Sequence, residues 1–428
     1  MTIAVQVLSF AIFVVVTAYA VRHYRFLWNR MFERQDRAYQ DLAGSYLPSV
    51  TVIIPMHNES RVAAGVIEHL VAADYPQELL QILAVNDHSS DDTAEIINAV
   101  AARYPNVTPV HRTDPGEARG KTEALKTGTA MATGEVILVF DADYRPGRGL
   151  LKRLVAPFCD PGVGAVMGRV VPSNSAANAL TRLLDLERAG GYQANLQARQ
   201  NLGLLVQYGG TVGGVRRSVL EAVGGWVPHL TEDTDLTLRI YLRGFRVVYV
   251  NIAECYEEVV QDWAARTKQL SRWAVGHNMV MLDYLGPTLR SKVLTPRQKI
   301  EGVLLLGVYL APVMLLAGWI ASIYLAFVSS GWFLTVYTGI LGSLSFNAWG
   351  NLAAFNEIGS ALLLDRRTRS ILLLPLAIFS SFAGMWICTG ALMKTVKARI
   401  RKTGLAWDKT PRYTQDAAPA PAEPETSR

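Results

Sequence analysis

The sequence predicts an α/β domain, with a mainly parallel β-sheet covered by helices on both faces, joined to α-helical membrane segments. Strand-like and helix-like segments alternate from about residue 49 to residue 251, which is the pattern of βαβ units. Long apolar segments lie on both sides of this region, and 50% of all residues are apolar. We therefore expect a globular domain combined with parts that lie in a membrane.

The first element is an uncharged apolar run from Thr2 to Val21, about long enough to span a bilayer. A cleaved signal peptide has a basic segment ahead of its apolar part, and this run has none. We therefore expect residues 1–22 to be a retained transmembrane anchor. The first charges, Arg22 and Arg25, follow the run, so the positive-inside rule places the next domain in the cytosol, at the cell membrane.

The globular region, residues 48–258, opens with alternating strands and helices. The predicted strands are Val50–Ile54, Leu79–Val85, Val107–His111 and Val136–Phe140. The predicted helices between them are Ser60–Ala73, Asp91–Arg103 and Lys121–Ala132. Polar residues follow three of the strands, and the carboxyl ends of parallel strands meet at one edge of a sheet. We expect these polar residues to converge on a single cleft.

Asp141 and Asp143 follow the last of these strands, which is apolar and mostly β-branched. Two carboxylates in this position can hold a hard divalent cation that bridges the protein to a diphosphate. An Asx turn that only ends the strand would have the same sequence. The interpretation of this Asp-x-Asp pair therefore depends on the surrounding motifs.

The region after the globular domain is predicted to lie at or in the membrane. Residues 259–300 include an amphipathic helix, Gln261–Leu285, which carries too many charges to cross a bilayer and is expected at the interface. The apolar segments within residues 301–394 are Gly302–Val328, Trp332–Phe355 and Ile371–Met393. Three full crossings would place the basic start of the tail, residues 395–428, outside the cell. We expect a cytosolic tail, disordered towards its end, which requires one of the three segments to be re-entrant or interfacial.

Charge and cysteine usage narrow the class of protein. The net charge of +6 is modest, and basic residues such as Arg22 and Arg30 cluster beside the apolar segments, which suits anionic lipid headgroups better than nucleic acid. We find no nucleic-acid-binding module. The three cysteines, Cys159, Cys255 and Cys388, have neither metal-ligand nor redox spacing and are expected to be packing residues in a reducing compartment.

Several motifs stand in order along the chain. They are residues 50–59, residues 86–91, the triplet Thr231-Glu232-Asp233, and the sequence Gln269-Leu270-Ser271-Arg272-Trp273. Together they resemble the family 2 glycosyltransferases, specifically the membrane-integrated processive synthases related to cellulose, chitin, hyaluronan and poly-N-acetylglucosamine synthases. The resemblance covers residues 48–285 by motif and the apolar segments by layout, and it implies a GT-A-type fold.

The resemblance implies a nucleotide site at the strand ends. In the family the opening strand and loop lie beside the nucleotide, and here they contain Pro55, His57 and Glu59. An aspartate after the second strand contacts uracil in the family, and Asp87 matches it. The residues on either side of Asp87 depart from the family's pattern of two aspartates and a glycine, so Asp87 alone supports the preference for UDP.

A diphosphate site is implied next to the nucleotide. Lys121 begins a predicted helix and resembles the family's diphosphate-contacting lysine. A glycine followed by a cation at a helix start offers free N–H groups and a charge to phosphate, although a solvated basic turn is the default for such a lysine alone. The resemblance gives Asp141 and Asp143 the metal-binding role, with Mg²⁺ or Mn²⁺ as the cofactor that holds the diphosphate.

The triplet Thr231-Glu232-Asp233 resembles the family's catalytic triplet, in which the aspartate is the general base. Inverting glycosyl transfer needs a carboxylate that deprotonates the acceptor hydroxyl. Asp233 is the candidate, with Glu232 beside it. The same residues suit a helix N-terminus, with Thr231 as the N-cap and the acids near the positive end of the helix dipole. Both interpretations can hold together.

Acceptor-binding residues are also implied. Gln269, Arg272 and Trp273 are spaced i, i+3 and i+4, so they share one face of a helix. Arg272 can contact the leaving diphosphate, and Trp273 offers a flat surface to a sugar ring. A membrane-surface helix with an interfacial tryptophan is the alternative. Gly210 and Thr211 lie in a glycine-rich stretch that lines the acceptor pocket in the family, or marks only a tight turn.

The sequence therefore predicts a processive, inverting enzyme that extends a β-linked polysaccharide from UDP-glucose or UDP-N-acetylglucosamine and moves it across the membrane. The expected partners are the UDP-sugar, the growing polysaccharide, the bilayer and possible accessory export subunits. A first alternative is a non-processive enzyme that adds one sugar to a lipid carrier. A second, from another class, is a catalytically silent channel or scaffold subunit.

Overall fold

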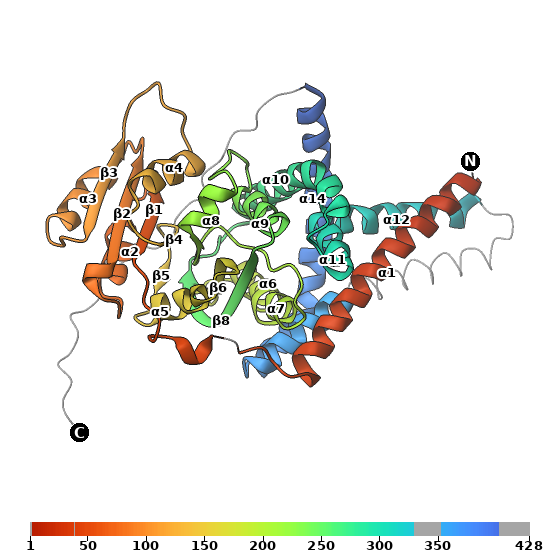
Figure 1. The fold of residues 1–428 in the computed structure, drawn as a ribbon. Helices are drawn as coiled ribbons and strands as arrows, with labels where there is room; N and C mark the ends of the chain where they lie inside the picture. Colours follow the sequence, from red (N-terminus) through yellow and green to blue (C-terminus); the bar gives the residue numbers. More distant parts are fainter. Residues whose placement is uncertain (1, 38, 329–351, 402–428) are drawn as a thin grey trace.

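The computed structural model describes residues 2–37, 39–328 and 352–401, and it shows the predicted α/β domain built on a mixed eight-stranded sheet (Figure 1). The strands lie in the order β3-β2-β1-β4-β7-β6-β8-β5. Their bounds are β1 Val50–Met56, β2 Leu80–Asp87, β3 Val107–Arg112, β4 Val136–Val139, β5 Arg145–Pro146, β6 Val163–Pro172, β7 Gly213–Arg216 and β8 Arg246–Glu257.

The half of the sheet formed by β3, β2, β1 and β4 is parallel throughout. Its apolar strands are buried on both faces, as Ile53 and Ile137 show with no exposed surface, and such strands need a helical layer on each side. Helices α2 (Ala63–Val71) and α3 (Thr93–Ala101) contact each other, while α4 (Lys121–Met131) packs across β1 and β2. The predicted strands and helices of this half are confirmed, with ends that differ by at most three residues.

The strand order turns back at β1, because β2 and β3 lie on one side of β1 and β4 lies on the other. In open parallel sheets, ligands bind beyond the carboxyl ends of the strands at such a point. His57 directly follows β1, and Asp141 lies two residues after the end of β4. The predicted convergence of polar strand ends is therefore confirmed at this edge.

The other half of the sheet is mixed. Strand β7 is antiparallel to both of its neighbours, β4 and β6, and the short β5 is antiparallel to β8, while β6 and β8 are parallel. A Cβ atom on Gly214 would lie 2.3 Å from Leu138 Cδ2, and one on Gly213 would lie 2.4 Å from the carbonyl oxygen of Val166. These two glycines of the glycine-rich stretch therefore allow β7 to pack between its neighbours.

Shorter helices complete the domain. They are α5 Leu150–Val155, α6 Ala179–Arg188, the π-helix η4 Ala189–Leu196, α7 Gln197–Asn201, α8 Arg217–Ala222 and α9 Glu232–Leu242. Cys255 and Cys388 are buried, as expected of packing residues. The expectation is wrong for Cys159, which is exposed at the end of the short 3₁₀ turn after α5.

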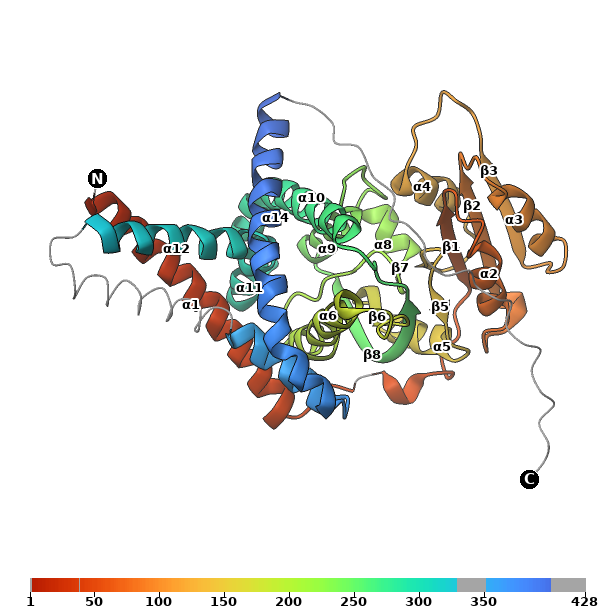
Figure 2. The same ribbon diagram turned by 180° about the vertical axis from the view of Figure 1, so that it is seen from behind.

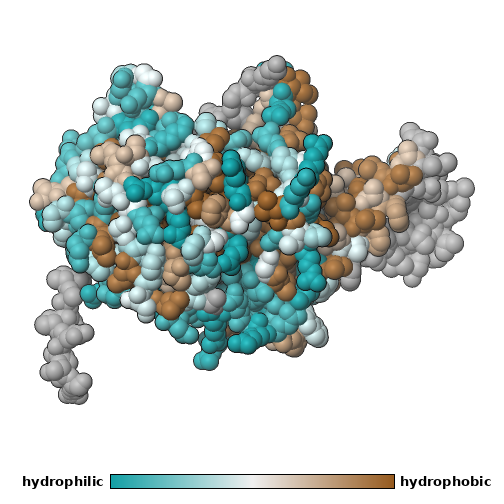
Figure 3. Space-filling model, in the orientation of Figure 1, coloured by the Kyte–Doolittle hydropathy of each residue, from teal (hydrophilic) through white to brown (hydrophobic). Residues whose placement is uncertain are grey.

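The helices outside the domain are α1 Thr2–Phe32, α10 Trp263–Arg290, α11 Pro296–Leu306, α12 Leu310–Val328 and α14 Leu374–Arg401. Helices α1 and α12 lie side by side and project from the domain, and α14 packs along α10 (Figures 1 and 2). Apolar side chains gather on the projecting part, coloured brown in Figure 3. Within the described residues, two helices are long and apolar enough to cross a membrane, Val7–Phe32 and Thr368–Arg401.

The structure describes the predicted membrane segments in part. The first, Gly302–Val328, is divided between α11 and α12, which are bent by 68° in the manner of a broken span or a re-entrant loop. If the bent pair α11–α12 is counted as one span, it is a third candidate crossing. The second, Trp332–Phe355, lies outside the described residues except for its last four, which begin a short apolar helix, Leu352–Leu364. The tail beyond Arg401 also lies outside them.

The basic residues after the first apolar run do not all face lipid headgroups, so that expectation is wrong for Arg22 and Arg30. Arg22 is buried and forms an ion pair of 2.8 Å with Glu301, which also pairs with Arg199 at 3.0 Å. Arg30 donates to the backbone carbonyl oxygen of Gln193 at 2.8 Å. A buried carboxylate needs an opposite charge beside it. Arg22 therefore joins α1 to α11, and Arg30 joins α1 to η4 of the domain.

Candidate active site

A cavity of about 1480 Å³ lies beyond the carboxyl ends of β1, β2 and β4 and extends beneath α10 to α12 and α14. The predicted site residues that line it are Pro55, His57, Glu59, Asp87, Lys121, Asp141, Asp143, Thr211, Glu232, Asp233, Gln269, Arg272 and Trp273. Gly210 is not among the lining residues, but its neighbours on both sides are. The structure thus brings together residues that are nearly 220 positions apart in the chain.

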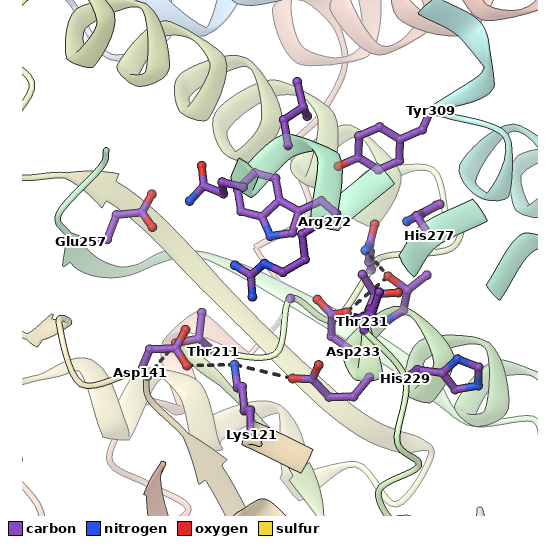
Figure 4. Close-up of a pocket in the computed structure, with 18 of the residues that line it drawn as sticks. Lys121, Asp141, Thr211, His229, Thr231, Asp233, Glu257, Arg272, His277 and Tyr309 are labelled. Carbon is purple, nitrogen blue, oxygen red and sulfur yellow. Dashed lines mark hydrogen bonds and ion pairs between the residues drawn. The ribbon is translucent and has the colours of Figure 1, made fainter. Parts of the chain in front are cut away.

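One end of the cavity is charged. The Lys121 ammonium lies 2.8 Å from Asp141 and 3.6 Å from Glu232, and it donates to the Gly210 carbonyl oxygen at 3.0 Å (Figure 4). Burial alone would lower the pKa of Lys121, but the two carboxylates raise it above its ordinary value. The Asp141 N–H donates to Thr211 Oγ1 at 3.1 Å. Lys121 therefore stays charged where a diphosphate could replace its carboxylate partners.

Asp141 and Asp143 both line this end of the cavity, as a metal site requires. No group of three or more His, Cys, Asp or Glu side chains arranged to hold a metal ion occurs in the described part of the chain. A cation here would have two protein carboxylates at most, and would take its remaining oxygen ligands from phosphate and water. Mg²⁺ is commonly bound in this way in phosphate-transferring sites. The two carboxylates of Asp141 and Asp143 therefore fit a hard divalent ion that is held jointly with a diphosphate.

Asp87 lines the cavity, but its carboxylate is engaged within the protein. Its Oδ1 forms ion pairs with Arg112 at 2.5 Å and His88 at 2.8 Å, and its Oδ2 accepts from the Gly120 N–H at 2.7 Å. The side chain therefore holds the loop that presents Lys121. The implied contact between Asp87 and uracil remains a prediction.

Asp233 lies in the first turn of α9, with Thr231 in the N-cap position, as expected. The Thr231 side chain makes no capping hydrogen bond, so that part of the prediction is wrong. A methyl-sized group on Gly276 of α10 would meet Thr231 Cγ2 at 2.7 Å, which shows how closely α10 packs on this turn. The close packing leaves the Thr231 hydroxyl buried and without a hydrogen-bond partner.

The Asp233 carboxylate is oriented by groups that the sequence motifs did not reveal. Its Oδ1 accepts from the Thr234 N–H at 2.7 Å, and the Thr234 hydroxyl accepts from Gln207 Nε2 at 2.9 Å. Burial, followed by the nearby Glu232 carboxylate, raises the pKa of Asp233 from its ordinary value to about 7. A carboxylate with such a pKa is suited to accept a proton near neutral pH.

Arg272 points from α10 into the cavity, between Asp141 and Lys121 on one side and Tyr309 on the other (Figure 4). Trp273 has a different environment from the one expected. The guanidinium of Arg188 lies 5.4 Å from its ring centroid and that of Arg266 lies 5.7 Å from it. Arg266 also donates to Gln269 Oε1 at 3.2 Å. Much of the surface that we expected to grip a sugar polymer is thus in contact with arginines.

Glu257 is a further lining residue that the sequence analysis missed. It ends β8, where it accepts from the Tyr144 hydroxyl at 2.9 Å and pairs with Arg188 at 2.5 Å. Like Asp141 it is a carboxylate at a strand end, but its own strand contains Asn251 and Glu254 and is not an apolar run. The sequence analysis had assigned no strand to residues 243–258, so this strand end was not considered.

Residues 48–276, just over half of the chain, match the profile of the family described as "Glycosyltransferase like family 2". The chain belongs to this family and is a glycosyltransferase. The resemblance found from the motifs is confirmed at this level, and so is the expectation of an enzyme.

Two individual members among the known proteins are similar in sequence to this chain. The chain is 34% identical over 248 residues to "Probable glycosyltransferase YdaM" of Bacillus subtilis, covering 58% of this chain and 59% of the relative. It is 33% identical over 239 residues to "Beta-monoglucosyldiacylglycerol synthase" of a Synechocystis species, covering 55% and 49%. The chain thus spans only about half to three fifths of the length of these relatives. Neither name is that of a polysaccharide synthase.

Among solved structures, the fold is similar to that of a mannosyltransferase from Pyrobaculum calidifontis in complex with GDP-mannose and Mn²⁺. The TM-score is 0.59 at 23% identity, and the match covers 86% of this chain and 99% of the other. This similarity confirms the predicted α/β fold of GT-A type with flanking helices.

Proposed function

We propose that this glycosyltransferase transfers a single sugar, with inversion, from a nucleotide-diphosphate sugar to a lipid acceptor at a membrane. The observation that supports this proposal most strongly is that one cavity joins the charged strand ends to helices α12 and α14. A relative that makes a glucosyl lipid supports this choice of acceptor. The arginines against Trp273 also favour single transfer over the gripping of a polymer.

The reaction needs a base on the acceptor side and positive charge on the donor side. Asp233 takes the proton of the acceptor hydroxyl as the hydroxyl oxygen bonds to the anomeric carbon. The bond from that carbon to the diphosphate oxygen breaks on the opposite face, and its electron pair leaves with the nucleoside diphosphate. Thr234 keeps the carboxylate aimed at the acceptor through its N–H.

The developing negative charge is the main electrostatic demand, and fixed positive groups meet it best in a site shielded from water. Lys121 and Arg272 are placed to contact the diphosphate. A divalent cation at Asp141 and Asp143 would neutralise further charge on the phosphates. The mannosyltransferase of similar fold was solved with Mn²⁺, which supports this cofactor. UDP is our expected nucleotide, by the resemblance of the strand-end motifs.

The test is release of nucleoside diphosphate by the detergent-purified full chain with Mg²⁺ or Mn²⁺, across a panel of nucleotide sugars. Each sugar is offered without acceptor, with a diacylglycerol and with a polyprenyl phosphate, and products are identified by mass spectrometry. We expect release that depends on a lipid and a product one sugar heavier than that lipid. A long, lipid-free polymer would instead support the processive synthase, and no release under any condition would contradict the proposal.

A further inference from the structure

The cavity has an apolar arm beyond Arg272 and Asp233. It is lined by Tyr309 at the α11–α12 bend, by Pro312 and Leu315 of α12, and by Gly384, Met385 and Cys388 of α14. Ser380 and Ser381 of α14 also line the cavity, and their hydroxyls donate within the protein, to Glu187 at 2.8 Å and to the Ala377 carbonyl oxygen at 3.1 Å. Figure 4 shows both ends of the cavity, with the charged residues Lys121 and Asp141 at one side and Tyr309 of the apolar arm at the opposite side. A sugar ring offers mainly hydroxyl groups, so this lining suits a hydrocarbon chain better than a second sugar.

The apolar arm lies behind helices of membrane type. Helix α14 belongs to a candidate membrane-crossing segment, and its outer face exposes Phe379 and Trp386, with 69% and 67% of their surfaces accessible. Trp319 of α12 meets Phe382 of α14 edge to face at 5.5 Å. This contact closes α12 against α14, and it makes the wall between the apolar arm and the bilayer apolar as well.

The cations near the entrance of the apolar arm already have carboxylate partners. Arg266 pairs with Glu187 at 2.5 Å and Arg399 pairs with Asp283 at 3.2 Å. Arg188 is likewise paired with Glu257, as described above. Each of these arginines is matched by a carboxylate, so a lipid phosphate would have to displace Glu187, Glu257 or Asp283 here without the divalent cation that Asp141 and Asp143 could hold at the donor end.

His277 of α10 also lies at this entrance. It is buried beside Tyr309, and its Nε2 lies 2.9 Å from the Leu305 carbonyl oxygen. Burial lowers the pKa of His277 to about 4, so the ring is uncharged at neutral pH. His277 therefore adds no positive charge to the paired arginines of the entrance.

We propose that the apolar arm holds the hydrocarbon chains of an acceptor whose headgroup is an uncharged alcohol, so that its hydroxyl lies at Asp233. This inference rests on the proposed function and names its acceptor class. A lipid phosphate would have to displace Glu187 or Glu257 from the arginines with which they pair at the entrance.

Two glycines of α14 provide a matched test. A Cβ atom added to Gly384, in the apolar arm, or to Gly390, outside the cavity lining, would have no neighbouring atom within 4 Å. At both positions a larger side chain can therefore begin without a clash at its Cβ atom. In Gly384→Phe the ring would occupy the arm, whereas Gly390→Phe would leave it open.

The wild type, Gly384→Phe and Gly390→Phe are compared as full chains in mixed micelles. The acceptors are dioctanoylglycerol and a short-chain polyprenyl phosphate, and a series with none measures hydrolysis of the nucleotide sugar by water. We expect transfer to dioctanoylglycerol in the wild type and in Gly390→Phe. In Gly384→Phe we expect kcat/KM for dioctanoylglycerol to fall by roughly tenfold or more, with hydrolysis of the donor unchanged. Gly384→Leu should give an intermediate loss.

The outcomes separate the two proposals. Equal lipid transfer by Gly384→Phe and Gly390→Phe would overturn the apolar arm while leaving the proposed function intact. Transfer to polyprenyl phosphate in preference to dioctanoylglycerol would overturn the uncharged headgroup alone. Donor hydrolysis with no transfer to either lipid by the wild type would overturn the proposed function, and this inference with it.

Discussion

The two ends of the cavity are built in different ways. The donor end is formed by the carboxyl ends of neighbouring strands and is densely charged, with Lys121 among Asp141, Glu232 and the Gly210 carbonyl. The acceptor end is formed by helices α10, α12 and α14, with an apolar lining and arginines that are paired with carboxylates. On the proposed function the comparison separates two tasks, because the strand ends would serve the departure of the diphosphate and the helices would select the molecule that receives the sugar.

The largest expected effect falls between the two ends, at Asp233. Asp233→Asn keeps the shape of the side chain but cannot accept the proton, so we expect kcat to fall by roughly 10²–10⁴-fold. Binding of the nucleotide sugar, measured by calorimetry, should be nearly unchanged. Asp74→Asn serves as the control, because Asp74 is exposed and lies outside the cavity lining. Loss of donor binding equal to the loss of rate would show that Asp233 belongs to the donor end instead.

Removal of the divalent cation should affect the donor end only. A chelator is expected to abolish transfer, and Asp143→Asn to lower kcat/KM by roughly 10²-fold at limiting Mn²⁺, with partial recovery at high Mn²⁺. The measurement is a metal titration of activity, with lipid binding followed in parallel. Full activity in the chelator would contradict a metal role for Asp141 and Asp143.

The pH profile tests the coupling between Asp233 and Glu232. The base acts when it is unprotonated, so with a pKa of about 7 we expect kcat/KM to fall as the pH drops below 7 and to level off above it. The negative charge of Glu232 helps to raise this pKa, so Glu232→Gln should move the profile to lower pH. A profile that stays in place, or moves to higher pH, would show that another group controls the rate.

The smallest expected effect is at Gly210. Its φ of 71° disfavours other residues, and an added Cβ would lie 3.1 Å from Asp233 Cβ. Gly210→Ala should lower stability by about 1 kcal/mol and also lower kcat several-fold by moving the base. Gly203 has a similar φ of 62° with open space around it, so Gly203→Ala should have the stability cost alone. Thermal unfolding and kcat of both variants give the comparison, and equal kcat values would show that Gly210 does not position the base.

The sequence predicted the donor end far better than the acceptor end. Residues such as His57 and Asp141 follow apolar strands, and strand ends in a parallel sheet must meet, so local patterns were enough to bring them together. The ion pair of Lys121 with Asp141 and the Thr234–Gln207 support of the base were not predicted, because no periodic pattern specifies which polar groups pair across the sheet edge.

The acceptor end depends on packing between distant segments. Trp273 shares a helix face with Gln269 and Arg272, as the spacing predicted, but its arginine neighbours come from α6 and from another turn of α10. The contacts of α14 with α10 and of α12 with α14 were equally invisible in the sequence, since apolar helices carry little information about their partners. The sequence-based prediction of a polysaccharide acceptor could not take these contacts into account.

The most direct measurement is the stoichiometry of the reaction at completion. The full chain is given a limiting amount of dioctanoylglycerol and an excess of nucleotide sugar, and the nucleoside diphosphate released above the lipid-free rate is compared with the lipid consumed. The account predicts about one diphosphate for each lipid molecule, with all product one sugar heavier than the acceptor. Many diphosphates for each acceptor, together with a long polymer, would contradict it.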